Sequence, residues 1–204
     1  MQTQEAPYQV QAIVDLATEY SADHFRYAIG ECRKVLAQVI AEDNRSDQQL
    51  ARVRVLRHLD RQLGRAVKWV EAETDLMALV VRSQIELRFW ASYVSKGPTE
   101  AKAFLEEANI DTRQLHEKMM KAYPTEVQPL AVPIPGKLIS LTRIDDDEEL
   151  VYKLCSKLIH TTSLILNSPD ESILDTGFRQ FLAVQALKYG WGILNIFHNI
   201  DWIE

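Results

Sequence analysis

Residues 76–94 read LMALVVRSQIELRFWASYV, an apolar segment with the polar pattern Arg82-Ser83-x-x-Glu86 near its middle. An apolar run of this length suggests a membrane span. However, the charges of Arg82, Glu86 and Arg88 would make insertion into lipid costly. The segment therefore predicts a buried core helix and no membrane span.

A second apolar segment, residues 150–166, reads LVYKLCSKLIHTTSLIL and carries Tyr152, Ser156 and His160 at four-residue spacing. That spacing places the three polar side chains on one face of a helix. Polar groups on apolar helices need partners, because an unpaired buried polar group costs free energy. We therefore expect the two polar patterns to face each other across a polar pocket, between helices at about 74–96 and 146–166.

The rest of the chain favours helices as well. It has 204 residues, of which 47% are hydrophobic and 25% charged, with seven glycines and seven prolines and no sustained alternation typical of strands. We predict an all-α fold, a single-domain bundle (1–204) of five or more helices. Its first helix would span about 8–40 and its last about 175–199. A proline-rich loop at 124–136 is a candidate lid or partner contact.

One helix of this acidic chain is strongly basic. The chain has a net charge of −6, but residues 45–68 hold seven Lys or Arg against two Asp. Three- and four-residue steps align five of these cations on one helical face. They are Arg54, Arg57, Arg61, Arg65 and Lys68. The face can meet phosphates or a protein partner, but pairing with acidic helices of the same molecule is the favoured interpretation.

His160 is the first candidate for chemistry, because an imidazole exchanges protons near neutral pH. A hydrogen-bonded structural cluster is the alternative. The other four histidines are scattered and the two cysteines isolated, and no nucleotide-binding glycine motif occurs. We therefore expect no metal and no cofactor. The N-terminal sequence lacks the basic start and apolar core of a secretory signal, which predicts a cytoplasmic location.

The pair of motifs R-S-x-x-E and Y-x-x-x-S-x-x-x-H, over about residues 74–166, resembles a group of uncharacterised all-helical bacterial proteins. More loosely it is similar to the HEPN superfamily of toxin–antitoxin and phage-defence proteins. That resemblance implies a homodimer that binds RNA or cleaves it without metal, with His160 as the catalytic histidine. The family places an Arg four to six residues before its His. No Arg occurs between Arg143 and His160.

The resemblance therefore implies that Arg82 supplies the guanidinium from another helix and stabilises the phosphate charge. Glu86 would hold Arg82, and Tyr152, Ser156 and Ser83 would position the substrate. Two other functions stay open. The chain can be a non-catalytic module that binds a protein partner through its basic helix or its proline-rich loop. It can also be a nucleotide or small-molecule sensor that uses the same polar pocket.

Overall fold

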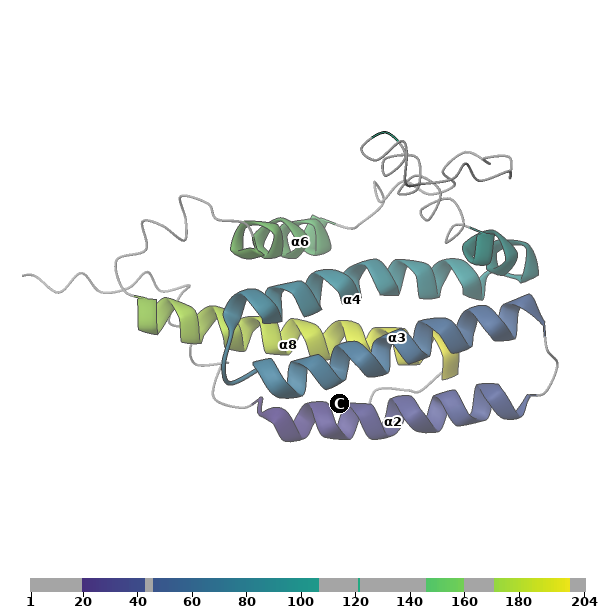
Figure 1. The fold of residues 1–204 in the computed structure, drawn as a ribbon, viewed down its shortest axis with the longest axis horizontal. Coiled ribbons are helices and arrows are strands. Elements are labelled where there is room, and N and C mark those ends of the chain that lie inside the picture. Colours follow the sequence, from purple (N-terminus) through teal and green to yellow (C-terminus); the bar gives the residue numbers. More distant parts are fainter. Residues whose placement is uncertain (1–19, 43–45, 107–120, 122–145, 160–170, 199–204) are drawn as a thin grey trace, which may run out of the picture.

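The computed structural model describes residues 20–42, 46–106, 121, 146–159 and 171–198, and it confirms the predicted all-α helical bundle (Figure 1). No strand occurs in this part of the chain. Residues 98–106 are helical after the break at Gly97. The longer helices are α2 (Ala22–Ala41), α3 (Asp47–Trp69), α4 (Thr74–Ser95), α6 (Asp146–Ile159) and α8 (Glu171–His198).

The beginnings of the helices follow local capping chemistry. Ser46 precedes α3, and its hydroxyl accepts a hydrogen bond from the Gln49 backbone N–H at 3.1 Å. The predicted continuous helix over 8–40 is wrong at Ser21, which has an extended backbone (φ −110°, ψ 174°). The Ser21 backbone N–H donates to Nδ1 of His24 at 3.1 Å, so this pair caps a helix that begins at Ala22.

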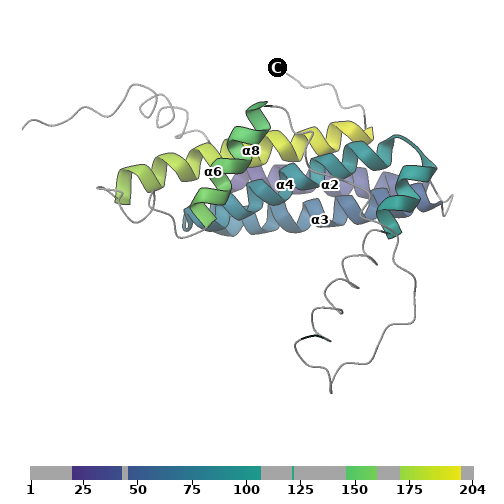
Figure 2. The ribbon, with the colours of Figure 1, turned by 90° about the horizontal axis from the view of Figure 1, so that it is seen from above.

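Helix α4 lies at the centre of the bundle, packed against α3, α8 and α6. Helix α2 packs against α3 and α8 on the opposite side from α6 (Figure 1). Seen from above, α6 runs at a steep angle across α4, whereas the other long helices follow the long axis of the molecule (Figure 2). The predicted core helix at about 74–96 is therefore confirmed, and α6 covers its outer side.

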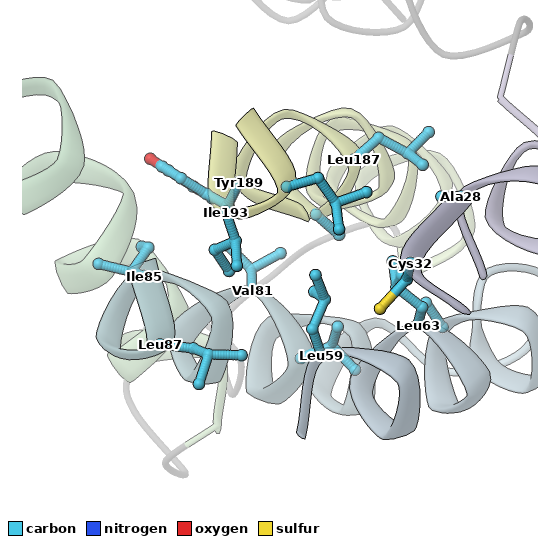
Figure 3. Close-up of a cluster of buried hydrophobic side chains, with 14 of the residues drawn as sticks. Ala28, Cys32, Leu59, Leu63, Val81, Ile85, Leu87, Leu187, Tyr189 and Ile193 are labelled. Carbon is cyan, nitrogen blue, oxygen red and sulfur yellow. The ribbon is translucent and has the colours of Figure 1, made fainter. Parts of the chain in front are cut away.

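The core is formed where α3, α4 and α8 meet (Figure 3). Leu59, Leu63, Val81 and Ile193 are all fully buried there. Helix α8 is apolar around most of its circumference because α2, α3 and α4 all pack against it. Among the described residues, no helix is long and apolar enough to cross a membrane.

Gln84 is a polar exception inside this core. Its side chain is fully buried, and neither its amide nitrogen nor its amide oxygen has a hydrogen-bond partner among the described residues. Gly190 of α8 lies opposite the amide. A Cβ atom at Gly190 would lie 3.7 Å from Nε2 of Gln84 and 3.4 Å from Cδ2 of Leu63. An unpaired buried amide is costly, so Gln84 lowers the stability of the bundle.

We expect Gln84→Met to raise the free energy of unfolding by about 2 kcal/mol, because methionine keeps the shape of the side chain without its unpaired polar atoms. Urea unfolding followed by circular dichroism measures the change. Gln84→Ala serves as the matched control, since it removes the same polar atoms but leaves a cavity. Lower stability of the methionine variant would show that the amide has partners in solution.

Candidate functional site

The two polar patterns meet between α4 and α6. Nε of Arg82 donates to the Tyr152 hydroxyl at 3.1 Å, and that hydroxyl donates to Oε1 of Glu86 at 3.0 Å. The Arg82 guanidinium also lies over the Tyr152 ring, 4.8 Å from its centre, and its Nε is 3.5 Å from Oε1 of Glu86. Tyr152 therefore contacts both charged residues of the first motif, and the two polar patterns face each other as expected.

This cluster is more open than the sequence suggests. The side chains of Arg82 and Glu86 are 31% and 38% exposed, so the expectation that an apolar segment buries this pair is wrong. Three helices pack against α4, and Arg82 and Glu86 lie where α4 meets α6. Burial is still sufficient to raise the pKa of Tyr152, and the Glu86 carboxylate raises it further. The hydroxyl therefore stays protonated and can donate.

The remaining predicted site residues do not all join this cluster. The Ser156 hydroxyl donates to the Tyr152 carbonyl oxygen of its own helix at 2.9 Å. His160 lies outside the described residues, as do the end of the predicted 146–166 helix and the loop at 124–136. Ser83 contacts α3 instead of α6, because successive residues of a helix point in different directions.

Ser83 belongs to a second polar cluster, with His58 and Gln62 of α3. The Gln62 amide nitrogen donates to the Ser83 hydroxyl oxygen at 2.8 Å and lies 2.8 Å from Nε2 of His58. The Ser83 hydroxyl is 3.3 Å from the same ring nitrogen. The Gln62 amide oxygen accepts from Arg65 at 3.4 Å, which fixes the orientation of the amide.

These contacts determine which ring nitrogen of His58 carries the proton. An amide nitrogen can only donate, so Nε2 of His58 accepts and the ring proton resides on Nδ1. Burial lowers the pKa of His58 below its ordinary value of 6.5, and the nearby charges of Arg61 and Arg65 lower it further. At neutral pH the ring is therefore uncharged and has one N–H left to donate.

A pocket of about 630 Å³ adjoins this cluster, between α3, α4 and the helix at 98–106. One wall carries the exposed arginines of α3, and the other carries Glu86 and two aromatic rings. Trp90 and Phe104 form that aromatic wall, with ring centres 5.1 Å apart. The pocket is lined by Arg54, Val55, Arg57, His58, Arg61, Ser83, Glu86, Leu87, Trp90 and Phe104.

The basic face of α3 is exposed along its whole length, and all five of its cations are on the surface. The favoured interpretation was that acidic helices neutralise this face. Instead, none of Arg54, Arg57, Arg61, Arg65 and Lys68 forms an ion pair with a described carboxylate. Asp60 of the same helix faces α2 and pairs with Arg33 at 2.8 Å. Within the described part of the chain, the positive charge of this face is left unneutralised.

Four residues at the pocket and the second cluster are not among the predicted site residues: His58, Gln62, Trp90 and Phe104. A usable signal was present in α3, where Arg54, His58 and Gln62 follow one another at four-residue spacing on one face. Arg54 therefore stands about one helical turn before His58 on the wall of the pocket. No comparable signal pointed to Phe104, which reaches the pocket only because the chain reverses at Gly97 and Pro98.

The two thiols are poorly suited to chemistry at either cluster. Cys32 and Cys155 are free and buried, and burial is the main cause that raises the pKa of each thiol to about 12. Among the described residues, no group of three His, Cys, Asp or Glu side chains is close enough to hold a metal ion.

Comparison of the chain with protein-family models, with curated proteins and with solved structures finds no match. The described residues form an all-α bundle with a pocket that carries three arginines.

The state of His58 predicts how stability depends on pH. The unfolded chain takes up a proton at this residue below about pH 6.5, where the folded protein still keeps the ring neutral. The stabilisation from His58 is therefore complete above pH 6.5 and is lost as the pH falls toward its lowered folded-state pKa. The charged groups that face His58 are the arginines of α3 and Glu86 of α4.

Urea unfolding of wild type and His58→Gln at about pH 7.5 and about pH 5.5 tests this expectation. We expect a smaller loss of stability at the lower pH in the variant than in wild type. His198→Gln removes an exposed histidine at the end of α8 and should behave like wild type. Equal losses in all three proteins would contradict a lowered pKa at His58.

Proposed function

We propose that this chain binds single-stranded RNA across the basic face of α3. The observation that carries the proposal is the set of five exposed cations, unneutralised within the described part of the chain, three of which open onto the pocket. Arginine pairs well with phosphate because its planar guanidinium can donate two parallel hydrogen bonds. The adjoining aromatic wall supports a single-stranded ligand, since unstacked bases can lie against exposed rings.

The proposal extends to cleavage, on the strength of the HEPN-like resemblance. In this mechanism His160 takes the proton from a ribose 2′-hydroxyl, whose oxygen attacks the neighbouring phosphorus while the bond to the 5′-oxygen breaks. The departing 5′-oxygen takes a proton from water, so the products are a 2′,3′-cyclic phosphate and a 5′-hydroxyl. Arg82 stabilises the charge that develops on the phosphate, and Glu86 and Tyr152 hold its guanidinium. A role in bacterial defence and a homodimer follow from the same resemblance.

Binding is tested by fluorescence anisotropy with a labelled single-stranded RNA over a range of salt concentrations. Each phosphate contact contributes about −0.7 to the slope of log K against log salt, so contacts from the five cations of the face predict a slope of about −3.5. No binding at low salt would contradict the proposed function and would favour the protein-interaction module.

A further inference from the structure

We propose that the pocket between α3, α4 and residues 98–106 is a subsite for one nucleobase that carries an exocyclic amino group, such as cytosine. This inference rests on the proposed RNA binding and specifies which part of the RNA enters the molecule. The pocket volume of about 630 Å³ lies within the range of roughly 300–1,000 Å³ that ligand pockets cover.

The charges on the two walls orient the ligand. Arg54, Arg57 and Arg61 on the α3 side attract a phosphate, whereas Glu86 on the α4 side repels one. A nucleotide therefore enters with its phosphate toward α3 and its base toward α4. His58 lies between the arginines and can donate its Nδ1–H to a phosphate oxygen.

The base meets an aromatic surface on the α4 side. Trp90 and Phe104 both line the pocket, both are half-buried, and their rings are tilted by 56° to each other. Half-buried rings held by a neighbouring ring are rigid platforms for stacking, and any base can stack on them. Stacking thus provides affinity without selecting one base.

Selection comes from Glu86. Its Oε1 accepts from Tyr152 and lies near Arg82, while its Oε2 has no hydrogen-bond partner among the described residues. Tyr152 and Arg82 thereby fix the carboxylate in the pocket wall with one acceptor oxygen available. A carboxylate accepts from the amino group of cytosine, whereas uracil presents a carbonyl oxygen at that position and is repelled.

Two source molecules share this chemistry, a base within RNA and a free nucleotide. Labelled oligocytidylate and oligouridylate of equal length test the polymer by anisotropy, and CMP and UMP as competitors test the free nucleotide. We expect about ten-fold tighter binding of the cytosine oligomer, the effect of one hydrogen bond to a charged group. If CMP displaces the labelled oligomer at a concentration close to that at which the oligomer itself binds, the ligand is a free nucleotide. If CMP does not displace the oligomer, the ligand is the polymer.

Glu86→Gln is the decisive variant. It keeps an acceptor for Tyr152 but replaces the carboxylate with an amide that both donates and accepts, so uracil should bind more tightly and the preference for cytosine should fall close to one-fold. Glu149→Gln removes the same charge from an exposed position on α6, outside the pocket, and should preserve the preference. Trp90→Leu should weaken both oligomers about ten-fold, with circular dichroism to verify folding.

The failures of the two proposals are distinguishable. Equal binding of the cytosine and uracil oligomers by wild type would overturn the base subsite and leave RNA binding intact. An unchanged cytosine preference in Glu86→Gln would also overturn it, because the selection would then arise elsewhere. Absence of binding to either oligomer and to both nucleotides would overturn the proposed function together with the subsite.

Discussion

Replacement of Arg54, Arg57 and Arg61 together by glutamine is expected to weaken single-stranded RNA binding about 100-fold at about 0.15 M salt. Each arginine lost removes one site at which a phosphate displaces its counterion, so the slope of log K against log salt should also change from about −3.5 to about −1.4, the share of Arg65 and Lys68. Fluorescence anisotropy at several salt concentrations measures both quantities. The three side chains are exposed, so the fold should be retained.

The matched control removes three cations from a different helix. Arg26, Arg33 and Lys34 of α2 are exposed, but each pairs with a carboxylate, on Asp23, Asp60 and Glu31 respectively. Their replacement by glutamine changes the net charge of the chain by the same amount. Equal loss of affinity in the two triple variants would show that RNA responds to total charge, and would contradict a specific interface on α3.

His160→Ala is expected to reduce cleavage of labelled RNA in EDTA at least 100-fold, because general acid–base catalysis by one side chain typically contributes 100- to 10,000-fold. The assay should resolve product ends, since the proposed reaction leaves a 2′,3′-cyclic phosphate. RNA binding by the variant should stay within a few-fold of wild type. The binding face lies on α3, whereas His160 belongs to the second polar pattern of the sequence.

His58→Ala is the informative companion to this experiment. His58 follows Arg54 at four-residue spacing and lines the cationic pocket, but its acceptor nitrogen is occupied by Gln62. We therefore expect weaker binding of RNA by this variant, with cleavage of bound RNA retained. Loss of cleavage in His58→Ala and retention in His160→Ala would move the catalytic centre to the pocket. No cleavage by wild type would leave a protein that binds RNA without cutting it.

Much of the fold could be predicted from the sequence because its helices carry strong local signals. Ser46 at the start of α3 and Gly97-Pro98 after α4 are cap and breaker residues whose effect is local, and the structure contains both boundaries. The start of α2 was missed because its cap, Ser21 with His24, does not follow the usual pattern of a serine and a glutamate.

The site was only partly predictable, because it depends on which helices become neighbours. The pairing of Arg82 and Glu86 with Tyr152 follows from the need of polar groups on apolar helices for partners. The direction of Ser83 does not follow from that rule, since one step along a helix turns a side chain toward a different neighbour. The sequence analysis grouped Ser83 with Arg82, whereas its hydroxyl contacts His58 across the α3–α4 interface.

The position of α8 in the bundle has a consequence for synthesis of the chain. Helices α2, α3 and α4 lie close together in sequence, but the apolar faces that they share are completed by Leu182, Ile193 and Leu194 near the C-terminus. At a synthesis rate of roughly 5–20 residues per second, these three helices leave the ribosome several seconds before α8 does. During that interval the nascent chain exposes the surface on which α8 later docks. A ribosome-associated chaperone would be best able to protect the chain in this period, and a messenger cut short before the codon for Glu171 would encode a product that keeps this surface exposed.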